Sequence, residues 1–245
     1  MLNLDRDRDV RATLALLDLI QERQADTQGA RAALEDLIDS RTSFVFGCGT
    51  SLDTQIDGLL PDLAGSDIPL IAADGAASAL MHRGIRPHIV VTDLDGNPSD
   101  ICRASHEGSI LVLHCHGDNI SEVRRWFPRL SNVVPVTQTE PTSAVSNYGG
   151  FTDGDKCIFI AVHFRAARII LSGMDFGTLI GRWSLYRPRD PQSLDLKRKK
   201  LEIARELTSH IIRVSGIPVS SLPPRCLTFL QETTYDEARD LLRGD

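Results

Sequence analysis

Aromatic side chains are scarce in this chain, whose 245 residues include 2 Trp, 3 Tyr and 8 Phe. Basic charge is not in excess either, because 33 acidic residues outweigh 27 lysines and arginines to give a net charge of −6. General binding of nucleic acid needs a basic surface field, which this charge balance does not provide. We therefore expect no nucleic-acid partner.

Cysteine patterns and long apolar runs are also missing. The five cysteines (Cys48, Cys102, Cys115, Cys157 and Cys226) are scattered, and no Cys-x-x-Cys pair occurs, which argues against a zinc ribbon or a disulfide framework. No apolar run approaches the ~20 residues needed to span a bilayer, and the charged start MLNLDRDRDVR lacks the apolar core of a signal peptide. These features predict a soluble cytoplasmic protein with no membrane partner.

What the chain does have, from residue 43 onward, is a series of short apolar runs that end in glycine or aspartate. Continuous apolar runs are typical of strands that are covered on both faces. The predicted strands are 44–46, 69–72, 89–91, 110–114, 133–136 and 169–172. Helical patterns separate several of them, over 76–83, 120–127 and 155–167. This alternation predicts an α/β fold with an open, mostly parallel sheet flanked by helices.

The N-terminal part of the chain has a helical sequence pattern without strand signals. Helical spacing of Leu14, Leu17 and Ile20, and a second stripe over 33–38, predict two helices between residues 9 and 38 with a break near 26–29. We expect residues 1–42 to form an N-terminal helical extension on a 43–245 α/β catalytic domain.

The C-terminal third is less regular. Its Arg- and Pro-rich stretch 183–193 predicts a loop, and a long helix is expected over 194–214, ended by Gly216 and Pro218. A late edge strand within 218–224 and a terminal helix over 235–242 complete the prediction.

Carboxylates follow two of the predicted strands at the point where each ends. Asp93 and Asp95 follow the run 89–91, and Asp74 follows the run 69–72. Open parallel sheets bind ligands outside the carboxyl ends of their strands, and Asp93 and Asp95 share one side if the strand continues through them. Magnesium prefers one or two carboxylates together with phosphate oxygens. The pattern predicts a magnesium–polyphosphate site, and the alternative is that each Asp-Gly merely makes a turn.

The segment 47–51, Gly-Cys-Gly-Thr-Ser, follows the first predicted strand. Such a loop can bring backbone N–H groups close to phosphate oxygens, which makes Gly47, Gly49 and Ser51 candidates for nucleotide contact. It is neither a Walker loop nor a full dinucleotide fingerprint. The alternative is a tight turn into a helix that Thr50 or Ser51 caps.

A second glycine-rich loop, 149–155, precedes a predicted helix. Thr152 can cap this helix, and Asp153 and Asp155 suit the positive end of its dipole. Capping explains one acidic residue more easily than two, so a functional loop is favoured.

The segment 114–119, His-Cys-His-Gly-Asp-Asn, combines two histidines with two polar residues beyond them. His114 and His116 share one face if the segment is extended, but no third zinc ligand occurs at a typical spacing. A substrate contact or a structural role is favoured over a metal site. Asp118 and Asn119 either join the acidic rim or form a turn and helix cap.

Cationic groups are expected from the start of the long C-terminal helix. Lys197 and Lys200 are three residues apart and share a face. That face either supplies cations to a triphosphate or is a solvated charge run. Asp175, which follows the predicted strand 169–172, is a further candidate for the acidic rim.

Taken together, these motifs resemble the archaeal 6-hydroxymethyl-7,8-dihydropterin pyrophosphokinase family, over about residues 44–201. The motifs that carry the resemblance are AADGA at 72–76, VTDLDG at 91–96, HCHGDN at 114–119, GFTDGD at 150–155 and GMDFG at 173–177. The first two also resemble the catalytic half of thiamine pyrophosphokinases, which implies a fold of that type.

The resemblance implies that Mg²⁺ is the cofactor, that ATP is the co-substrate, and that the β,γ-pyrophosphoryl group passes to the hydroxymethyl oxygen of the pterin. AMP is then released, on the route to folate or tetrahydromethanopterin. Asp74, Asp93 and Asp95 are implied as the catalytic metal ligands, and Asp95 is a candidate to help remove the hydroxyl proton. The implied nucleotide- and phosphate-binding residues are Gly47, Gly49, Ser51, Asp118, Asn119, Asp153, Asp155, Lys197 and Lys200.

Two other functions compete with this one. The first is pyrophosphoryl transfer to thiamine or another small alcohol. The second is a nucleotide-binding module without transfer, against which the number of mutually repelling carboxylates counts. The N-terminal helices carry no chemistry that the sequence identifies. Phe151, Phe176, Trp183 and Tyr148 are each candidates to stack on the acceptor ring, and a homodimer is one expectation because C2 dimers are common.

Overall fold

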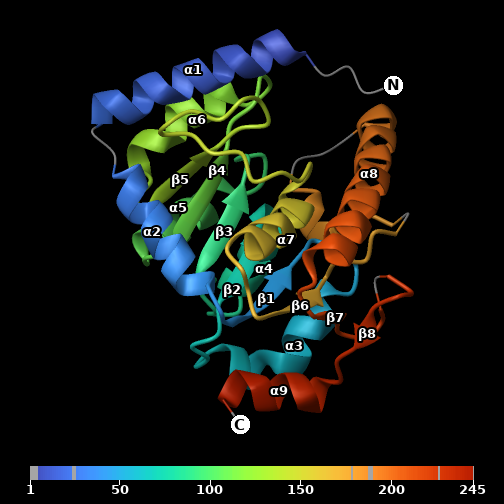
Figure 1. The fold of residues 1–245 in the computed structure, drawn as a ribbon. Coiled ribbons are helices and arrows are strands. Elements are labelled where there is room, and N and C mark those ends of the chain that lie inside the picture. The colour runs from blue at the N-terminus through green and yellow to red at the C-terminus, as the bar shows by residue number, and fades with distance from the viewer. Residues whose placement is uncertain (1–4, 24–25, 178, 187–189, 226, 245) are drawn as a thin grey trace.

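The protein is described by a computed structural model that covers residues 5–23, 26–177, 179–186, 190–225 and 227–244 (Figure 1). One sheet of eight strands runs through the described chain in the order β5-β4-β3-β2-β1-β6-β7-β8, and every pair in it is parallel. The strands are β1 (Thr42–Phe46), β2 (Leu70–Ala73), β3 (Ile89–Thr92), β4 (Ile110–His114), β5 (Val133–Val136), β6 (Arg168–Ser172), β7 (Val219–Ser221) and β8 (Gln231–Glu232). The predicted α/β class with a parallel sheet is confirmed.

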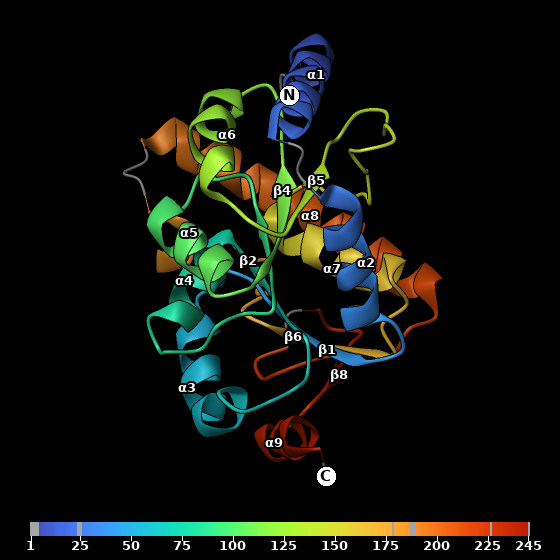
Figure 2. The same ribbon diagram turned by 90° about the vertical axis from the view of Figure 1, so that its left-hand side faces the viewer.

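Helices cover both faces of this sheet (Figure 2). They are α1 (Arg6–Arg23), α2 (Thr27–Ile38), α3 (Leu52–Leu63), α4 (Asp74–Met81), α5 (Pro98–His106), α6 (Ile120–Trp126), α7 (Asp153–His163), α8 (Pro191–Ser215) and α9 (Tyr235–Arg243), with short 3-10 turns η1 (Phe127–Arg129) and η2 (Arg182–Ser184). No helix in the described ranges is both long and apolar enough to cross a membrane.

Two hydrophobic cores, one on each face, explain why strands β2, β3, β4 and β5 are mostly apolar. Within β1, Phe44 and Phe46 enter the core shared with α1, α3, α4 and α5, whereas Val45 enters the core shared with α2 and α7. All three side chains are fully buried. Because successive strand residues point to opposite faces, a strand between two cores needs apolar residues at every position.

The chain reverses its direction of travel across the sheet at β1. From β1 it steps through β2, β3 and β4 to β5, and then returns through α7 to place β6 on the other side of β1. Such a switch point opens a crevice at the carboxyl ends of the strands, which is where open α/β sheets bind ligands.

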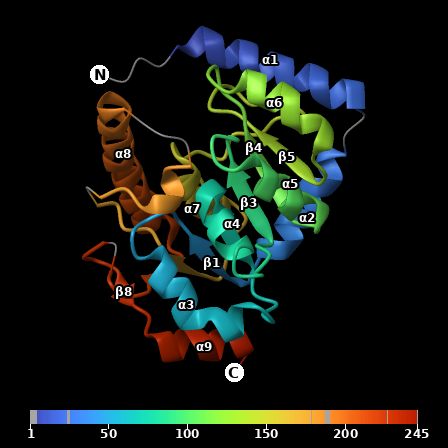
Figure 3. The same ribbon diagram turned by 180° about the vertical axis from the view of Figure 1, so that it is seen from behind.

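The N-terminal helices pack on this domain and share its cores. Helix α1 buries Ala12, Leu16 and Ile20 and lies across α6, while α2 packs on β5 from the opposite face (Figures 1 and 3). The predicted stripe was therefore partly wrong, because Leu14 points outward and is 55% exposed. Division of the chain at residue 42 stays a prediction.

Several boundaries differ from the sequence-based prediction. Helix α5 was not predicted as an element, although Asn97 caps it and Pro98 opens it, which are recognised start signals. Helix α3 follows Ser51, as the alternative interpretation of the loop 47–51 expected, but its end was not predicted. Strand β7 was expected at the edge of the sheet, but β8 pairs beyond it. Helix α8 begins at Pro191, three residues early, because Asp190 caps it. Residues 187–189 of the predicted loop and Cys226 lie outside the described residues.

Candidate active site

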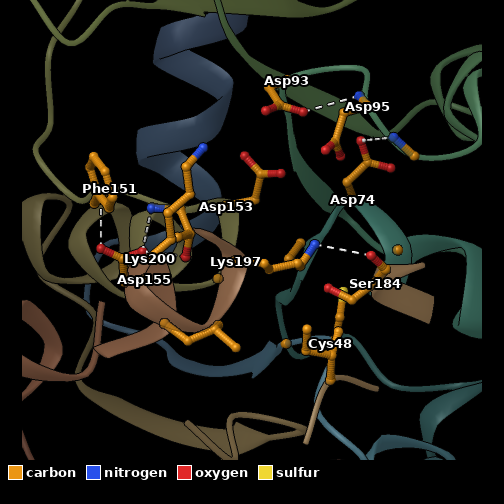
Figure 4. Close-up of a pocket in the computed structure, with 18 of the residues that line it drawn as sticks. Cys48, Asp74, Asp93, Asp95, Phe151, Asp153, Asp155, Ser184, Lys197 and Lys200 are labelled. Carbon is orange, nitrogen blue, oxygen red and sulfur yellow. Dashed lines mark hydrogen bonds between the residues drawn. The ribbon is translucent and has the colours of Figure 1, made fainter. Parts of the chain in front are cut away.

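A pocket of roughly 290 Å³ occupies the crevice at the carboxyl ends of β1, β2, β3, β4 and β6 (Figure 4). It is walled by the loops that follow these strands, by the first turn of α7, by the start of α8 and by the start of α1. Most of the motifs singled out in the sequence therefore meet at one place, as the rule for parallel sheets predicts.

Four carboxylates converge inside this pocket. Asp74, Asp93, Asp95 and Asp153 each offer an oxygen, and these atoms all lie within 4.8 Å of one another. Asp74 is buried, Asp93 and Asp153 are half-buried, and Asp95 is exposed. The structure thus brings the three predicted metal ligands together. It adds Asp153, which the resemblance had implied only as a nucleotide- or phosphate-binding residue.

The turn after β3 aims Asp93 and Asp95 at the same space. The strand stops at Thr92, and Leu94 adopts the left-handed backbone region with φ 66°. The Asp95 N–H donates to Asp93 Oδ1 at 3.0 Å, and the Leu94 N–H donates to Thr92 Oγ1 at 2.9 Å. The two carboxylates therefore meet through a turn, and the expectation that they share a strand face was wrong. A left-handed Leu costs about 1–2 kcal/mol, which this hydrogen bonding offsets.

Asp74, the first residue of α4, is held from one side only. Its Oδ2 accepts from Thr92 Oγ1 at 2.7 Å and from the Gly96 N–H at 3.2 Å. Its Oδ1 is buried without a hydrogen-bond partner among the described residues. A Cβ at position 96 would lie 2.0 Å from that oxygen, so a larger residue there would displace the Asp74 carboxylate. Burial, together with the nearby Asp93 and Asp95, raises the pKa of Asp74 to about 7.

The same crowding acts on Asp153. Burial raises the pKa of Asp153 well above its usual range, and the negative charges of Asp93, Asp74 and Asp95 add to this effect. A hard divalent cation relieves such repulsion and takes carboxylate oxygens as ligands. The orphaned oxygen of Asp74 and the oxygen-only donor set fit that kind of ion.

Asp93 differs because a histidine supports it. His116 Nε2 lies 3.4 Å from Asp93 Oδ2, while His116 Nδ1 accepts from the Asp118 N–H at 3.3 Å. Because Nδ1 accepts from the Asp118 N–H, the Nε2 side of the ring is the one that can donate to Asp93 Oδ2. Burial would raise the pKa of Asp93, but this contact prevails and holds it at about 2.

Asn119 and His114 lie at the wall of the pocket. The Asn119 amide donates to the carbonyls of Asp93 and His114, both at 2.7 Å, and so ties the loops after β3 and β4 together. Asn119 is not among the residues that line the pocket, so its predicted ligand contact stays a prediction. His114 lines the pocket, and burial and the charge of Lys156 lower its pKa well below the usual range.

The lysine run at the start of α8 divides between pocket and solvent. Lys197 and Lys200 line the pocket, and the Lys197 ammonium donates to the Ser184 carbonyl at 3.0 Å (Figure 4). Arg198 and Lys199 point outward and are exposed. This is the arrangement expected of two cations three residues apart on a helix that borders a ligand site.

The loop after β1 approaches the pocket through its glycines. Gly47 and Gly49 line the pocket, and a Cβ on Gly49 would lie 2.6 Å from the Gly173 carbonyl oxygen. The Ser51 N–H and hydroxyl, by contrast, donate to Asp175, the former at 2.9 Å. Ser51 and Asp175 thus fasten the loops after β1 and β6 together. The predicted nucleotide contact of Ser51 stays a prediction.

Two further predicted ligand residues are engaged with the protein itself. Asp155 is fully buried and accepts from the N–H groups of Phe151 and Thr152, at 2.7 and 2.6 Å, as the cap of α7. Asp118 lines the rim and forms an ion pair with Arg8 at 3.1 Å.

Three of the four candidate aromatic residues line the pocket. These are Phe151, Phe176 and Trp183, whereas Tyr148 packs against His163 and Phe164 behind α7. Asp53 holds Trp183 in place by accepting from its indole N–H at 2.9 Å.

Cys48 also lines the pocket but is unsuited to nucleophilic attack. Burial raises the pKa of the Cys48 thiol to about 12, and the positive charge of Lys197 only partly opposes this. The thiol is therefore protonated at neutral pH, when a nucleophile would need the thiolate.

The start of α1 reaches the pocket as well, which the sequence did not indicate. Arg8 and Asp9 line it together with Gln138 of the segment after β5. The nearest signal in the sequence is the charged start of the chain, and nothing there shows what those charges face.

The fold and this site define a class: an α/β protein whose pocket, at the switch point of a parallel sheet, combines carboxylates, lysines and glycine loops. A profile of the family described as 6-hydroxymethylpterin diphosphokinase MptE-like matches residues 23–181. The chain belongs to this MptE-like family.

Three archaeal relatives carry the name 6-hydroxymethyl-7,8-dihydropterin pyrophosphokinase. The protein from Methanocaldococcus jannaschii is 38% identical over 84% of this chain and 88% of its own length. The protein from Methanothermobacter thermautotrophicus is 40% identical over 74% and 78%, and that from Pyrococcus furiosus is 40% identical over 82% and 84%. The sequence resemblance to the pterin pyrophosphokinases is thereby confirmed.

Among solved structures, the MAf glycosyltransferase from Magnetospirillum magneticum AMB-1 aligns with 89% of this chain and 41% of its own. The identity is 16% and the TM-score 0.45. This likeness carries no argument about activity.

Proposed function

We propose that this protein is a magnesium-dependent pyrophosphokinase that transfers the β,γ-pyrophosphoryl group of ATP to 6-hydroxymethyl-7,8-dihydropterin. The observation that carries the proposal is the cluster of four carboxylate oxygens within 4.8 Å, which shares one pocket with Lys197 and Lys200. Membership of the MptE-like family and the names of the archaeal relatives support the choice of acceptor.

The reaction is a displacement at the β-phosphorus. The hydroxymethyl oxygen of the pterin forms a bond to this phosphorus, and the bond between it and the α,β-bridging oxygen breaks. AMP leaves, and the hydroxyl proton passes to a base. Reactions of this kind depend on positioning and charge neutralisation and need no nucleophilic side chain. That requirement suits a pocket whose one thiol, Cys48, is protonated.

The protein residues divide the work. Asp74, Asp93, Asp95 and Asp153 would hold Mg²⁺, whose charge, when bound, polarises the phosphoryl oxygens. Lys197 and Lys200 neutralise the polyphosphate from the side of α8, and Gly47 and Gly49 allow it close to the backbone.

The hydroxyl proton needs an acceptor near the carboxylate cluster. Asp95 is the most exposed of the four carboxylates and suits this role. Asp74 suits it less, because it is buried and its Oδ2 already accepts two hydrogen bonds.

The proposal is tested by incubating the protein with ATP, MgCl₂ and 6-hydroxymethyl-7,8-dihydropterin and separating the nucleotides by chromatography. We expect AMP and the pterin diphosphate in equal amounts, and neither without Mg²⁺. Formation of ADP, or of AMP without a pterin diphosphate, would contradict it. Thiamine serves as the competing acceptor, and faster turnover with thiamine would favour the alternative function.

We further propose that the enzyme acts as a 2-amino-4-hydroxy-6-hydroxymethyldihydropteridine diphosphokinase in folate or tetrahydromethanopterin synthesis. Both routes need the same pterin diphosphate, so the site chemistry supports them equally. Isotope tracing of the pterin in cells that lack this gene would distinguish them by which end product is lost.

A further inference from the structure

Helix α1 is fastened to the pocket by charged and polar groups. Asp9 Oδ1 accepts from the Gly117 N–H at 2.8 Å, and Asp9 Oδ2 accepts from the Gln138 amide at 2.6 Å. Arg8 donates to the Gly117 carbonyl at 3.1 Å and pairs with Asp118. These partners are more than 100 residues away in the sequence, so the contact is a feature of the tertiary fold.

The fit between α1 and the loop after β4 is close. A Cβ on Gly117 would lie 2.5 Å from the Cβ of Arg8, so only glycine permits this approach. Just below, the hydroxyls of Thr13, Thr137 and Thr139 form a hydrogen-bonded set with oxygen–oxygen distances of 2.7 to 3.2 Å. Helix α1 therefore has a fixed position over the carboxyl ends of β4 and β5.

The order of strands places this wall on one side of the carboxylate cluster. Along the sheet, β5 and β4 carry Gln138 and Gly117, β2 and β3 carry Asp74, Asp93 and Asp95, and β1 and β6 carry the glycine loops. Asp153 joins them from the start of α7. Lys197 belongs with the glycine loops, because its charge acts on Cys48 and its ammonium bonds to Ser184. The glycine loops and Lys197 thus lie on the other side of Asp74, Asp93 and Asp95 from α1, while the charge of Lys200 acts on His114 at the end of β4.

The α1 side offers the groups that an aminopyrimidinone edge needs. Asp9 is 8% exposed and lines the pocket, and each of its oxygens accepts one hydrogen bond although a carboxylate oxygen can accept two. The neighbouring Gln138 side chain carries both a donor and an acceptor. A pterin presents two adjacent donors, its 2-amino group and N3–H, beside the 4-oxo acceptor.

We infer that Asp9 and Gln138 form the acceptor subsite and recognise the 2-amino, N3–H and 4-oxo edge of the pterin, with α1 as its wall. This inference rests on the proposed function, because it assigns the acceptor of that reaction. The N-terminal helix then contributes to substrate specificity, and Asp9 and Gln138 are the residues that select the acceptor.

The test measures binding without turnover. Pterin fluorescence is titrated with protein in the presence of Mg²⁺ and α,β-methylene-ATP, in which the bond to be broken cannot be cleaved. Asp9→Asn should weaken pterin binding about tenfold and leave binding of the ATP analogue within about twofold. Gln138→Met should weaken pterin binding about threefold. The matched control, Asp18→Asn, makes the same change at an exposed position of α1 and should leave both affinities unchanged.

An acceptor analogue sharpens the assignment. The 2-oxo analogue of the pterin lacks the amino donor and should bind the wild-type protein about tenfold more weakly than the pterin. Asp9→Asn should remove most of this preference, which a merely structural defect would not do. Circular dichroism and thermal unfolding verify that each variant is folded. If Asp9→Asn does not fold, Gln138→Met with the same pair of ligands decides.

The outcomes separate this inference from the proposed function. Variants that fold, bind the pterin as the wild type does and keep its preference for the 2-amino group would overturn the subsite alone. Variants that weaken binding of the ATP analogue and not binding of the pterin would also overturn the subsite. If pterin binds and the variants weaken it as expected, but no AMP forms, the proposed transferase activity is refuted and the acceptor subsite stands. A wild-type protein that does not bind pterin would refute both.

Discussion

Two loops of this protein carry the same pattern of acidic residues and use it differently. In Asp93-Leu94-Asp95, after β3, both carboxylates enter the cluster. In Asp153-Gly154-Asp155, at the start of α7, Asp153 enters the cluster while Asp155 turns back to cap the helix. The difference lies in the backbone, because a helix N-terminus has N–H groups that need acceptors and a turn after a strand has few.

The comparison separates two ways in which a carboxylate is used. Asp155 is saturated by N–H and hydroxyl donors of its own loop, so it stabilises α7 and has little left for a ligand. In the cluster, by contrast, Asp74 Oδ1 has no hydrogen-bond partner among the described residues. Burial, together with the neighbouring aspartates, raises the pKa values of Asp74 and Asp153. Crowding of this kind is typical of sites that bind a cation.

The largest expected effect is on turnover, in Asp95→Asn. Loss of one clustered charge should reduce kcat/KM for AMP formation by about 10³ or more, because charge stabilisation at the reacting centre is lost. Steady-state kinetics at saturating Mg²⁺ measures this. Asp155→Asn is the matched control, since its amide oxygen can still cap α7, and we expect a loss of less than about tenfold. Equal losses in the two variants would contradict the division between cluster and cap.

The next effect is on stability and depends on pH, in Asp74→Asn. The pKa of Asp74 in the folded protein, about 7, lies above its ordinary value of 3.8, so folding favours the protonated form. Its contribution to stability is therefore full below pH 3.8 and is lost as the pH rises through about 7. In the metal-free protein at pH 8, Asp74→Asn should be the more stable form, by on the order of 2 kcal/mol.

Urea unfolding in EDTA at pH 4.5, 7 and 8 measures the difference in free energy of unfolding between Asp74→Asn and the wild type. This difference should shrink as the pH falls. Added Mg²⁺ should stabilise the wild-type protein more at pH 8 than at pH 6. At pH 8 the cation relieves repulsion between ionised carboxylates, whereas at pH 6 it must first displace the proton from Asp74. A difference between wild type and Asp74→Asn that is the same at every pH would show that Asp74 does not titrate in this way.

A smaller effect is expected from the histidine that supports Asp93. His116→Ala removes the hydrogen bond to Asp93 Oδ2 and should weaken the apparent affinity for Mg²⁺ about tenfold, as is usual for groups that orient a ligand. The Mg²⁺ dependence of AMP formation measures it. His106→Ala, at an exposed position of α5, is the control. An unchanged Mg²⁺ dependence in His116→Ala would mean that Asp93 needs no such support.

The smallest effect belongs to the cap itself. Asp155→Ala leaves the N–H groups of Phe151 and Thr152 without their acceptor and should lower the free energy of unfolding by about 1–2 kcal/mol. Urea unfolding of the metal-free protein measures the loss, and Asp155→Asn should restore most of it. If Asp155→Ala instead weakens Mg²⁺ binding as strongly as loss of a clustered carboxylate, the comparison between the two loops fails.

Much of the site was predictable because its residues sit at a repeated structural position. Asp74, Asp93 and the loop of Gly47 each follow a buried strand directly, and parallel strands present their carboxyl ends at one edge. Lys197 and Lys200 were predictable for a similar reason, since helical periodicity puts them on one face. Local pattern and one rule of sheet geometry were enough for these residues.

The other features of the site depend on contacts between segments that are distant in the sequence. The structure pairs Ser51 with Asp175 and Asp118 with Arg8, and the sequence indicated neither contact. Nothing local tells a serine or an aspartate which neighbour will satisfy it. For the same reason the sequence did not predict that α1 borders the pocket. Its Asp9 contacts Gly117 and Gln138, which are more than 100 residues away in the chain.

The sequence by itself determined the class of fold, the strand ends that carry the carboxylates, and the family. These depend on residues close together in the chain and on spacing that is read directly. Tertiary structure alone decided that Asp153 joins the cluster while Asp155 caps α7, and that α1 borders the pocket. The physical reason is competition for hydrogen-bond partners: a carboxylate binds whichever donors or cations the folded chain brings within reach, and only the folded chain determines which those are.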